Sequence, residues 1–357
     1  MTLTDSIIAA LTDIRHFFAP LFKSLIELLL QPTEKSVDVK VSLYKTLRLI
    51  LRAVFENNSA EIAFEAEDWL LDGHATSSSS SDEIVNIVET MAFDIGRHIS
   101  SNISDLPKHR KATAILLAND LLHEDLKGSK KLAACLSQSG VCRVLCEELL
   151  SIEFDWNVIA SPSGAAIVTR VEQCAQSHLL TSILTVFTRL ASSEQGWTAL
   201  SELAVTEIIA EMYVFTEPPK EVFLKPETVK IKGTPAYAFA NTLDLALHLC
   251  KQLCSKAKWK KLTLRILALI QSFGEIFQQL VRAGVACNCL ETARAIVYEV
   301  SVNDESIIDA IDGDNVLRQL RVSASEGLVS KKPKSAQINA NSSFAAPRQL
   351  FSTLLPV

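Results

Sequence analysis

The sequence is poor in residues that break helices and in residues that favour strands. Among its 357 residues are only 11 glycines and 11 prolines, and aromatic side chains make up 6%. Leu, Ile and Ala dominate instead, which favours helices over strands. We find no stretch in which apolar and polar residues alternate as they do along a half-buried strand. The composition therefore predicts an all-α protein.

The excess of positive charge that marks a nucleic-acid surface is also missing. The formal net charge is −6, whereas a dedicated nucleic-acid-binding face is basic. Two short basic stretches depart from this, at 256–262 (KAKWKKL) and 330–335 (SKKPKS). We interpret the first as a helix start with solvated lysines around Trp259, the alternative being a patch for nucleic acid or anionic lipid. The second resembles a minimal nuclear-localisation patch. We predict no direct nucleic-acid partner.

Neither a secretory leader nor a transmembrane segment is expected. The first thirty residues are interrupted by charged side chains, namely Asp5, Asp13, Arg15, Lys23 and Glu27. The eight cysteines lie within apolar helical stretches, so we predict free, buried thiols in a reducing compartment. These cysteines are Cys135, Cys142, Cys146, Cys174, Cys250, Cys254, Cys287 and Cys289.

No group of residues has the spacing of a known metal site. Cys142 with Cys146, and Cys250 with Cys254, each place two thiols on one helical face. A zinc site needs four ligands, and neither a CxxC pair nor two histidines three to five residues apart accompany these thiols. In 309–315 (DAIDGDN) a calcium loop would place residues that cannot bind the ion at its first and third positions. We therefore predict no metal site and no cofactor.

Catalytic motifs are equally missing. His123-Glu124 lacks the second histidine of a zinc-protease helix, and no glycine-rich phosphate loop occurs. Cys287 and Cys289 begin a helix, but no nearby histidine suggests a catalytic partner, so we interpret them as structural thiols. The sequence predicts no catalytic residues and a protein that is not an enzyme. The alternative is an enzyme whose site is assembled from residues distant in the sequence.

Apolar residues recur at helical spacing along most of the chain. In 41–55 the positions Leu43, Leu47, Ile50, Leu51 and Val54 form one stripe. Similar stripes run through 5–30, 84–103, 110–126, 165–190, 236–255 and 261–282. We predict a helical solenoid over 1–321, interrupted by a Ser-rich loop at 73–83 and a connector at 215–235. Residues 322–357 are polar and aperiodic, and we predict a disordered tail there.

One short pattern occurs three times, at LSQSGV (136–141), LSELAV (200–205) and LVRAGV (280–285). Each has a Leu that ends a helix, a small residue four positions on, and a Val that starts the next helix. Gly140 and Gly284 can close a helix in a left-handed conformation or let two helices approach, whereas Ala204 is expected to do only the second. Such helix pairs bury their apolar faces only by stacking on neighbours. We therefore predict an irregular α-solenoid of HEAT or armadillo type, with a compact helical domain as the alternative.

The order of these features resembles a known family. The segments are LSQSGVCRVLCEELL, HLLTSILTVFTRLASSEQGWTALSELAVTEIIAEMYVF, YAFANTLDLALHLCKQL, LRILALIQSFGEIFQQLVRAG and CLETARAIVYEV. Together they resemble the C-terminal region of the largest inner-ring scaffold nucleoporins of the nuclear pore complex. The resemblance covers roughly 110–321, and its most telling block is TRLASSEQGWTALSELAV. Family members are several times longer, so we expect either a fragment or a shortened form.

The resemblance implies a structural scaffold constituent of the nuclear pore complex, located at the nuclear envelope and supporting nucleocytoplasmic transport. It also implies that apolar grooves near the end of the superhelix bind linear helical segments of adaptor nucleoporins. The sequence assigns no partner-binding residues, and the helices expected at 286–300 and 303–321 are the first region to test. The alternative is another armadillo- or HEAT-type interaction adaptor in the cytosol or nucleus.

Overall fold

A computed structural model describes residues 3–31, 36–65, 80–123, 129–160, 167–255, 260–304, 307–308 and 315–322. Several sequence predictions fall outside these ranges. They are the tail from 323 onward, most of the Ser-rich loop, the first four residues of the stretch around Trp259, and most of the aspartate-rich stretch at 309–315.

The described residues form sixteen α-helices and one 3₁₀ helix, and none of them lies in a strand. This confirms the predicted all-α class. The helices are α1 (Leu3–Leu30), α2 (Val37–Glu65), α3 (Ser80–Asp105), α4 (Lys108–Leu121), α5 (Ser129–Gln138), α6 (Val141–Leu150), α7 (Trp156–Ala160), α8 (Ile167–Ala191), α9 (Glu194–Glu202), α10 (Val205–Glu211), α11 (Tyr213–Thr216), α12 (Glu221–Leu224), η1 (Pro226–Lys230), α13 (Pro235–Ser255), α14 (Lys260–Ser272), α15 (Gly274–Arg282) and α16 (Asn288–Asn303).

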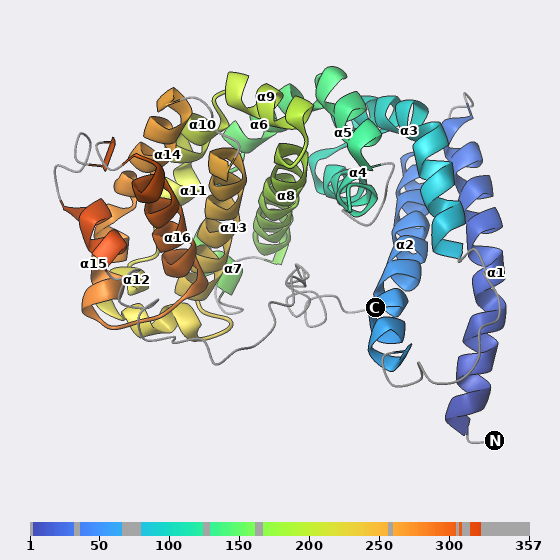
Figure 1. Ribbon diagram of the computed structural model, residues 1–357, viewed down its shortest axis with the longest axis horizontal. Coiled ribbons are helices and arrows are strands. Elements are labelled where there is room, and N and C mark those ends of the chain that lie inside the picture. Colours follow the sequence, from blue (N-terminus) through green and yellow to red (C-terminus); the bar gives the residue numbers. More distant parts are fainter. Residues whose placement is uncertain are drawn as a thin grey trace.

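The helices stack in rows rather than around one centre. In the first row α2, α4, α8, α13 and α16 follow one another, each packed against the next. A second row runs through α1, α3, α5 and α9, and a third through α6, α10 and α14. Figure 1 shows the resulting arched path, with α1 at one end and α14 to α16 at the other. This is the arrangement of an α-solenoid, in which each unit buries its apolar face against its neighbours.

The apolar stripes became the buried faces, as the periodicity predicts. In α2 the residues Leu43, Leu47, Ile50, Leu51 and Val54 are all buried. They belong to one continuous apolar core that runs from α1 to the helical turn at 316–322. Burial of these side chains supplies most of the stability of such a stack, at roughly 25 cal/mol for each Å² removed from water.

The helix boundaries differ from the sequence prediction in three places. The stripe at 261–282 is two helices, α14 and α15, which meet at Phe273. Gly274 begins α15 under the side chain of Val316, where an added Cβ would lie 2.9 Å from Val316 Cγ2. The connector at 215–235 contains the helical turns α12 and η1, and α3 begins at Ser80 inside the stretch predicted as a Ser-rich loop.

The three repeated corners form, with one correction. Gly140 and Gly284 have φ values of +81° and +64°, and Ala204 has +53°, so all three are left-handed. The prediction that Ala204 would not adopt this conformation was wrong. Its carbonyl accepts hydrogen bonds from the N–H groups of Glu207 and Ile208, which starts α10 and compensates for the steric cost.

The valine that follows each left-handed corner was predicted to start a helix, and two of the three do so. Val141 and Val205 start α6 and α10 as predicted. Val285 is buried, but α16 begins only at Asn288, so the third valine does not start a helix. Its N–H instead donates to the carbonyl of Leu280 and closes the end of α15.

Candidate interaction surface

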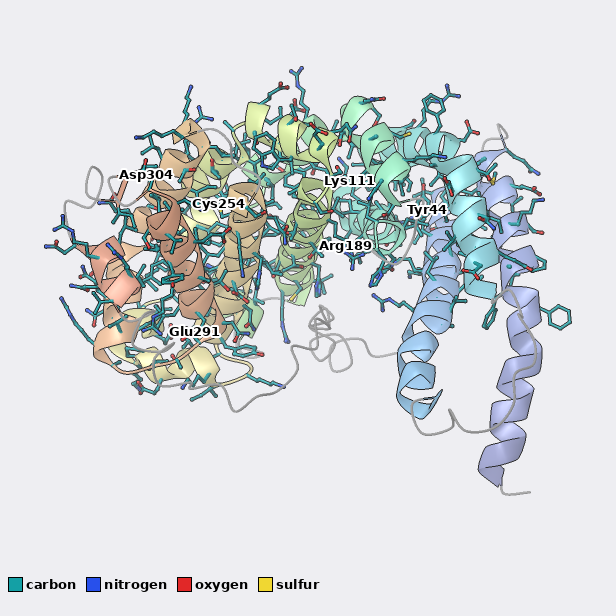
Figure 2. All side chains as sticks on the ribbon, viewed as in Figure 1. Tyr44, Lys111, Arg189, Cys254, Glu291 and Asp304 are labelled. Atoms are coloured by element: carbon teal, nitrogen blue, oxygen red, sulfur yellow. The ribbon has the colours of Figure 1, made fainter. Side chains whose placement is uncertain are left out.

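Charged side chains with little exposure join α4 to its neighbours α2, α8 and α6. Arg48 on α2 donates from Nε to Asp120 Oδ2 on α4 at 2.8 Å, with both side chains about 15% exposed. Arg189 on α8 donates to the carbonyl of Asn119, and Lys111 on α4 pairs with Glu148 on α6. Figure 2 shows Lys111 and Arg189 between neighbouring helices. Removing one partner of such a pair leaves a charge poorly solvated, so these contacts fix the register of the stack.

A second polar seam joins α13 and α16. Thr292 donates its hydroxyl to Asp244 at 2.7 Å, and His248 Nε2 lies 3.6 Å from the other carboxylate oxygen of Asp244. Burial raises the pKa of Asp244, while the bond from Thr292 and the charge of His248 oppose that rise. Burial lowers the pKa of His248 despite the nearby carboxylate. The seam holds α16 in a fixed orientation against α13.

The opposite face of α16 is open to solvent. Ile296, Val297 and Val300 point into the core, whereas Tyr298 is 40% and Val302 67% exposed. Glu291 lies on the same side two turns earlier and pairs with Arg294 at 2.8 Å. The spacing of 291, 298 and 302 places these three residues along one side of the helix. We call this side, defined by Glu291, Tyr298 and Val302, the α16 outer face.

The other end of the stack has a comparable apolar side. On α1, Phe17 is 71%, Leu21 45% and Leu28 40% exposed. Their spacing of four and seven residues places them on one side of the helix. These three side chains form a short exposed apolar strip on α1.

The outer layer also contains an open groove between α5 and α9. Its volume is about 330 Å³, and Glu194 and Glu202 contribute two carboxylates to its walls. The lining residues are Ser137, Gln138, Glu194, Gln195, Thr198, Ala199 and Glu202. Because most of these side chains are polar, the groove lacks the apolar walls that bind a drug-sized ligand.

The thiols are placed largely as structural groups. All eight are free, and Cys142, Cys146, Cys250 and Cys289 are buried as predicted. The prediction of burial was wrong for the other four, which are partly exposed. Burial raises the pKa of Cys142 to about 11 and that of Cys250 to about 12. Within the ranges that the structure covers, no three His, Cys, Asp or Glu side chains come together as a metal site.

The sequence indicates two C-terminal helices as the first region to test, and it indicates no individual contact. The stretch at 286–300 is α16 apart from its first two residues, and the stretch at 303–321 contributes short helical segments at 307–308 and 316–322. The contacts Arg48–Asp120 and Asp244–Thr292 join residues 72 and 48 positions apart. The only sequence signal for these two contacts is a charged residue or a hydroxyl within an otherwise apolar stripe.

A curved stack of helical units, with polar seams and apolar end faces, defines the class of α-solenoid scaffold proteins. The family described as nuclear pore complex scaffold, nucleoporins 186/192/205, matches residues 4–273. The chain belongs to this family, and it is a nucleoporin of the nuclear pore complex at the nuclear envelope. No curated protein matched the chain.

The family match and the sequence resemblance cover different parts of the chain. The match includes residues 4–109, which the resemblance over 110–321 leaves out, and it ends before α15 and α16. In the portion that the structure covers, no helix combines the length and the apolar character needed to cross a lipid bilayer.

Proposed function

We propose that the chain is a structural scaffold module of the inner ring of the nuclear pore complex, and that it binds short helical segments of adaptor nucleoporins. Membership of the scaffold family supports the first part. The α16 outer face supports the second, because an amphipathic helix can bury its apolar side against Tyr298 and Val302. The proposed role is to hold partners in place and so to support transport, without catalysis.

The α16 outer face has two properties that favour binding. It is rigid, because the opposite side of α16 is buried against α13 and Thr292 is bonded to Asp244. A preorganised surface loses little conformational entropy when a partner binds. It is also mixed in character, with Glu291 and Arg294 at one end and the two apolar side chains at the other. Such a face suits a partner helix with apolar residues in one half and a charge in the other.

The rival functions are less well supported. A general armadillo-type adaptor in the cytosol or nucleus would use the same kind of surface, but the family match favours a protein of the pore scaffold. An enzyme with a dispersed site would need a deep pocket with mutually perturbed titratable groups. The groove between α5 and α9 is open and does not have that form.

The test is direct binding of fluorescent peptides that carry helical segments of inner-ring adaptor nucleoporins. We expect at least one segment to bind the chain with a saturable anisotropy change. Replacement of Tyr298 by Ala together with Val302 by Ser should weaken that binding about tenfold or more, as loss of a central apolar contact does. Both residues are exposed, so the variant should keep the helical circular dichroism of the parent protein.

The matched control is the double variant Phe17→Ala with Leu21→Ser, which removes a similar apolar area at the other end of the stack. Binding that is unchanged in the α1 variant and weakened in the α16 variant supports the proposed face. Equal loss in both variants, or binding by none of the inner-ring segments, would overturn the proposal.

A further inference from the structure

Two thiols meet where the chain turns from α15 into α16. Cys287 lies at the residue before α16, with an extended backbone whose carbonyl accepts the N–H of Glu291. Cys289 lies in the first turn of that helix and is buried. Their sulfur atoms are 3.4 Å apart, which is hydrogen-bonding distance for a thiol and a thiolate.

Cys287 is open to reagents from the solvent side. Its side chain is partly exposed, and its neighbours Ala286 and Asn288 are exposed. A small molecule in solvent can therefore reach the partly exposed Cys287 side chain, whereas Cys289 is buried.

We propose that Cys287 and Cys289 form a thiol modification site, in which Cys287 reacts with a hydroperoxide and Cys289 then forms a disulfide with it. In the first step the Cys287 thiolate attacks one oxygen of the peroxide. A sulfur–oxygen bond forms, the oxygen–oxygen bond breaks, and the leaving alkoxide or hydroxide takes a proton from water. Cys287 becomes a sulfenic acid, and the peroxide is reduced by two electrons.

In the second step the Cys289 thiol loses its proton and attacks the Cys287 sulfur. A sulfur–sulfur bond forms, the sulfur–oxygen bond breaks, and the departing hydroxide combines with that proton as water. The sulfurs must approach from 3.4 Å to about 2.05 Å, the length of a disulfide bond. The net change is one disulfide from two thiols.

The groups around Cys287 favour its thiolate. The hydrogen bond from Cys289 is the largest influence and lowers the pKa of Cys287 to about 7, against the opposing effect of burial. The N–H of Leu290 and the charge of Lys230 lower it further, and Asp244 raises it. The same bond and burial raise the pKa of Cys289, so the two thiols have different roles. Cys287 is the attacking thiol and Cys289 the one that resolves the sulfenic acid.

The Cys250–Cys254 pair on α13 provides the matched comparison. Its members are four residues apart, and Cys254 is partly exposed like Cys287. Burial raises the pKa of Cys254 to about 11. At pH 7 the fraction of Cys287 present as thiolate then exceeds that of Cys254 by about four orders of magnitude. The thiolate of the more acidic thiol is intrinsically less reactive, and this offsets about two of those orders of magnitude. Cys287 should react on the order of a hundredfold faster.

The first measurement uses the unmodified protein, so it does not depend on how any variant folds. Limited alkylation with iodoacetamide at pH 7, followed by peptide mapping, should label Cys287 on the order of a hundredfold faster than Cys254. The labelling rate of Cys287 should reach half its maximum near pH 7. If Cys287 reacts no faster than Cys254 in the native protein, the proposal is overturned.

The second measurement identifies the products after treatment with hydrogen peroxide. The parent protein should yield a peptide in which Cys287 and Cys289 are joined. Cys289→Ser should instead accumulate a sulfenic acid at Cys287 that dimedone traps, and Cys287→Ser should give neither product. Failure of Cys289→Ser to give a trappable sulfenic acid at Cys287 contradicts the assignment of roles. The thiol site is independent of the proposed scaffold function, so an experiment that contradicts one of these two proposals leaves the other unaffected.

Discussion

The indole Nε1 of Trp197 donates a hydrogen bond to the backbone carbonyl of Leu253 at 2.9 Å, joining α9 to the end of α13. Trp156 does the same with the carbonyl of Val214 at 2.8 Å. Carbonyl groups in the last turn of a helix have no partner within the helix. Each tryptophan therefore satisfies a helix end that packing has removed from water, and it links two units of the stack.

Replacing Trp197 by Phe tests this link. The change leaves the Leu253 carbonyl without its donor, and it reduces the apolar contact of a side chain that is 8% exposed. We expect the free energy of unfolding to fall by about 1–2 kcal/mol, measured by urea denaturation. Tyr298→Phe, an exposed change of similar size, should leave the urea midpoint unchanged. An equal shift for both variants would contradict the role given to the indole.

At the left-handed corners, we expect two substitutions to change the stability of the protein in opposite directions. A left-handed conformation costs an L-residue about 1–2 kcal/mol relative to glycine, part of which glycine loses in the unfolded chain. Ala204→Gly should therefore stabilise the protein, and Gly140→Ala should destabilise it, each by about 1 kcal/mol. An added Cβ at Gly140 meets nothing within 4 Å, so its effect reports the backbone alone.

Thermal unfolding followed by circular dichroism compares these two corner variants with the parent protein. Ala199→Gly serves as the control, because Ala199 lies inside α9, where glycine is unfavourable. That control should lower the melting temperature, whereas Ala204→Gly should raise it. A fall in both would show that position 204 does not carry the left-handed strain that its φ of +53° indicates.

The sequence predicts the parts of the fold that depend on neighbours along the chain. The stripe in α2 and the corners at Gly140 and Gly284 follow from helical periodicity and from the conformational freedom of glycine. The break between α14 and α15 was missed, because it depends on Gly274 packing under Val316, a residue 42 positions later. The same limit applies to the surface. The exposure of Tyr298 and Val302 depends on which helices pack beside α16, and the apolar pattern alone does not specify that.

The hydroxyl of Tyr44 is buried without a hydrogen-bond partner among the described residues. The side chain is fully buried in α2, and no acceptor or donor among the described residues is bonded to its oxygen. Burial raises the pKa of this phenol. Tyr44→Phe removes a desolvated polar atom and keeps the ring, so we expect the free energy of unfolding to rise by about 1 kcal/mol. Tyr213→Phe is the exposed control in the same urea titration, and a loss of stability in Tyr44→Phe would show that the hydroxyl has a partner.

Because His178 on α8 is partly buried, we expect the protein to lose stability in mild acid. Burial lowers the pKa of His178 below its ordinary value of 6.5. Below pH 6.5 the unfolded chain therefore binds a proton that the folded chain does not, and the free energy of unfolding falls as the pH falls toward the folded-state pKa. One such group contributes at most about 1.4 kcal/mol per pH unit. Urea titrations of the parent protein and His178→Gln at pH 7 and pH 5 measure the effect. The parent should lose more stability than the variant over this interval, and an equal loss in both would assign the acid sensitivity to other groups.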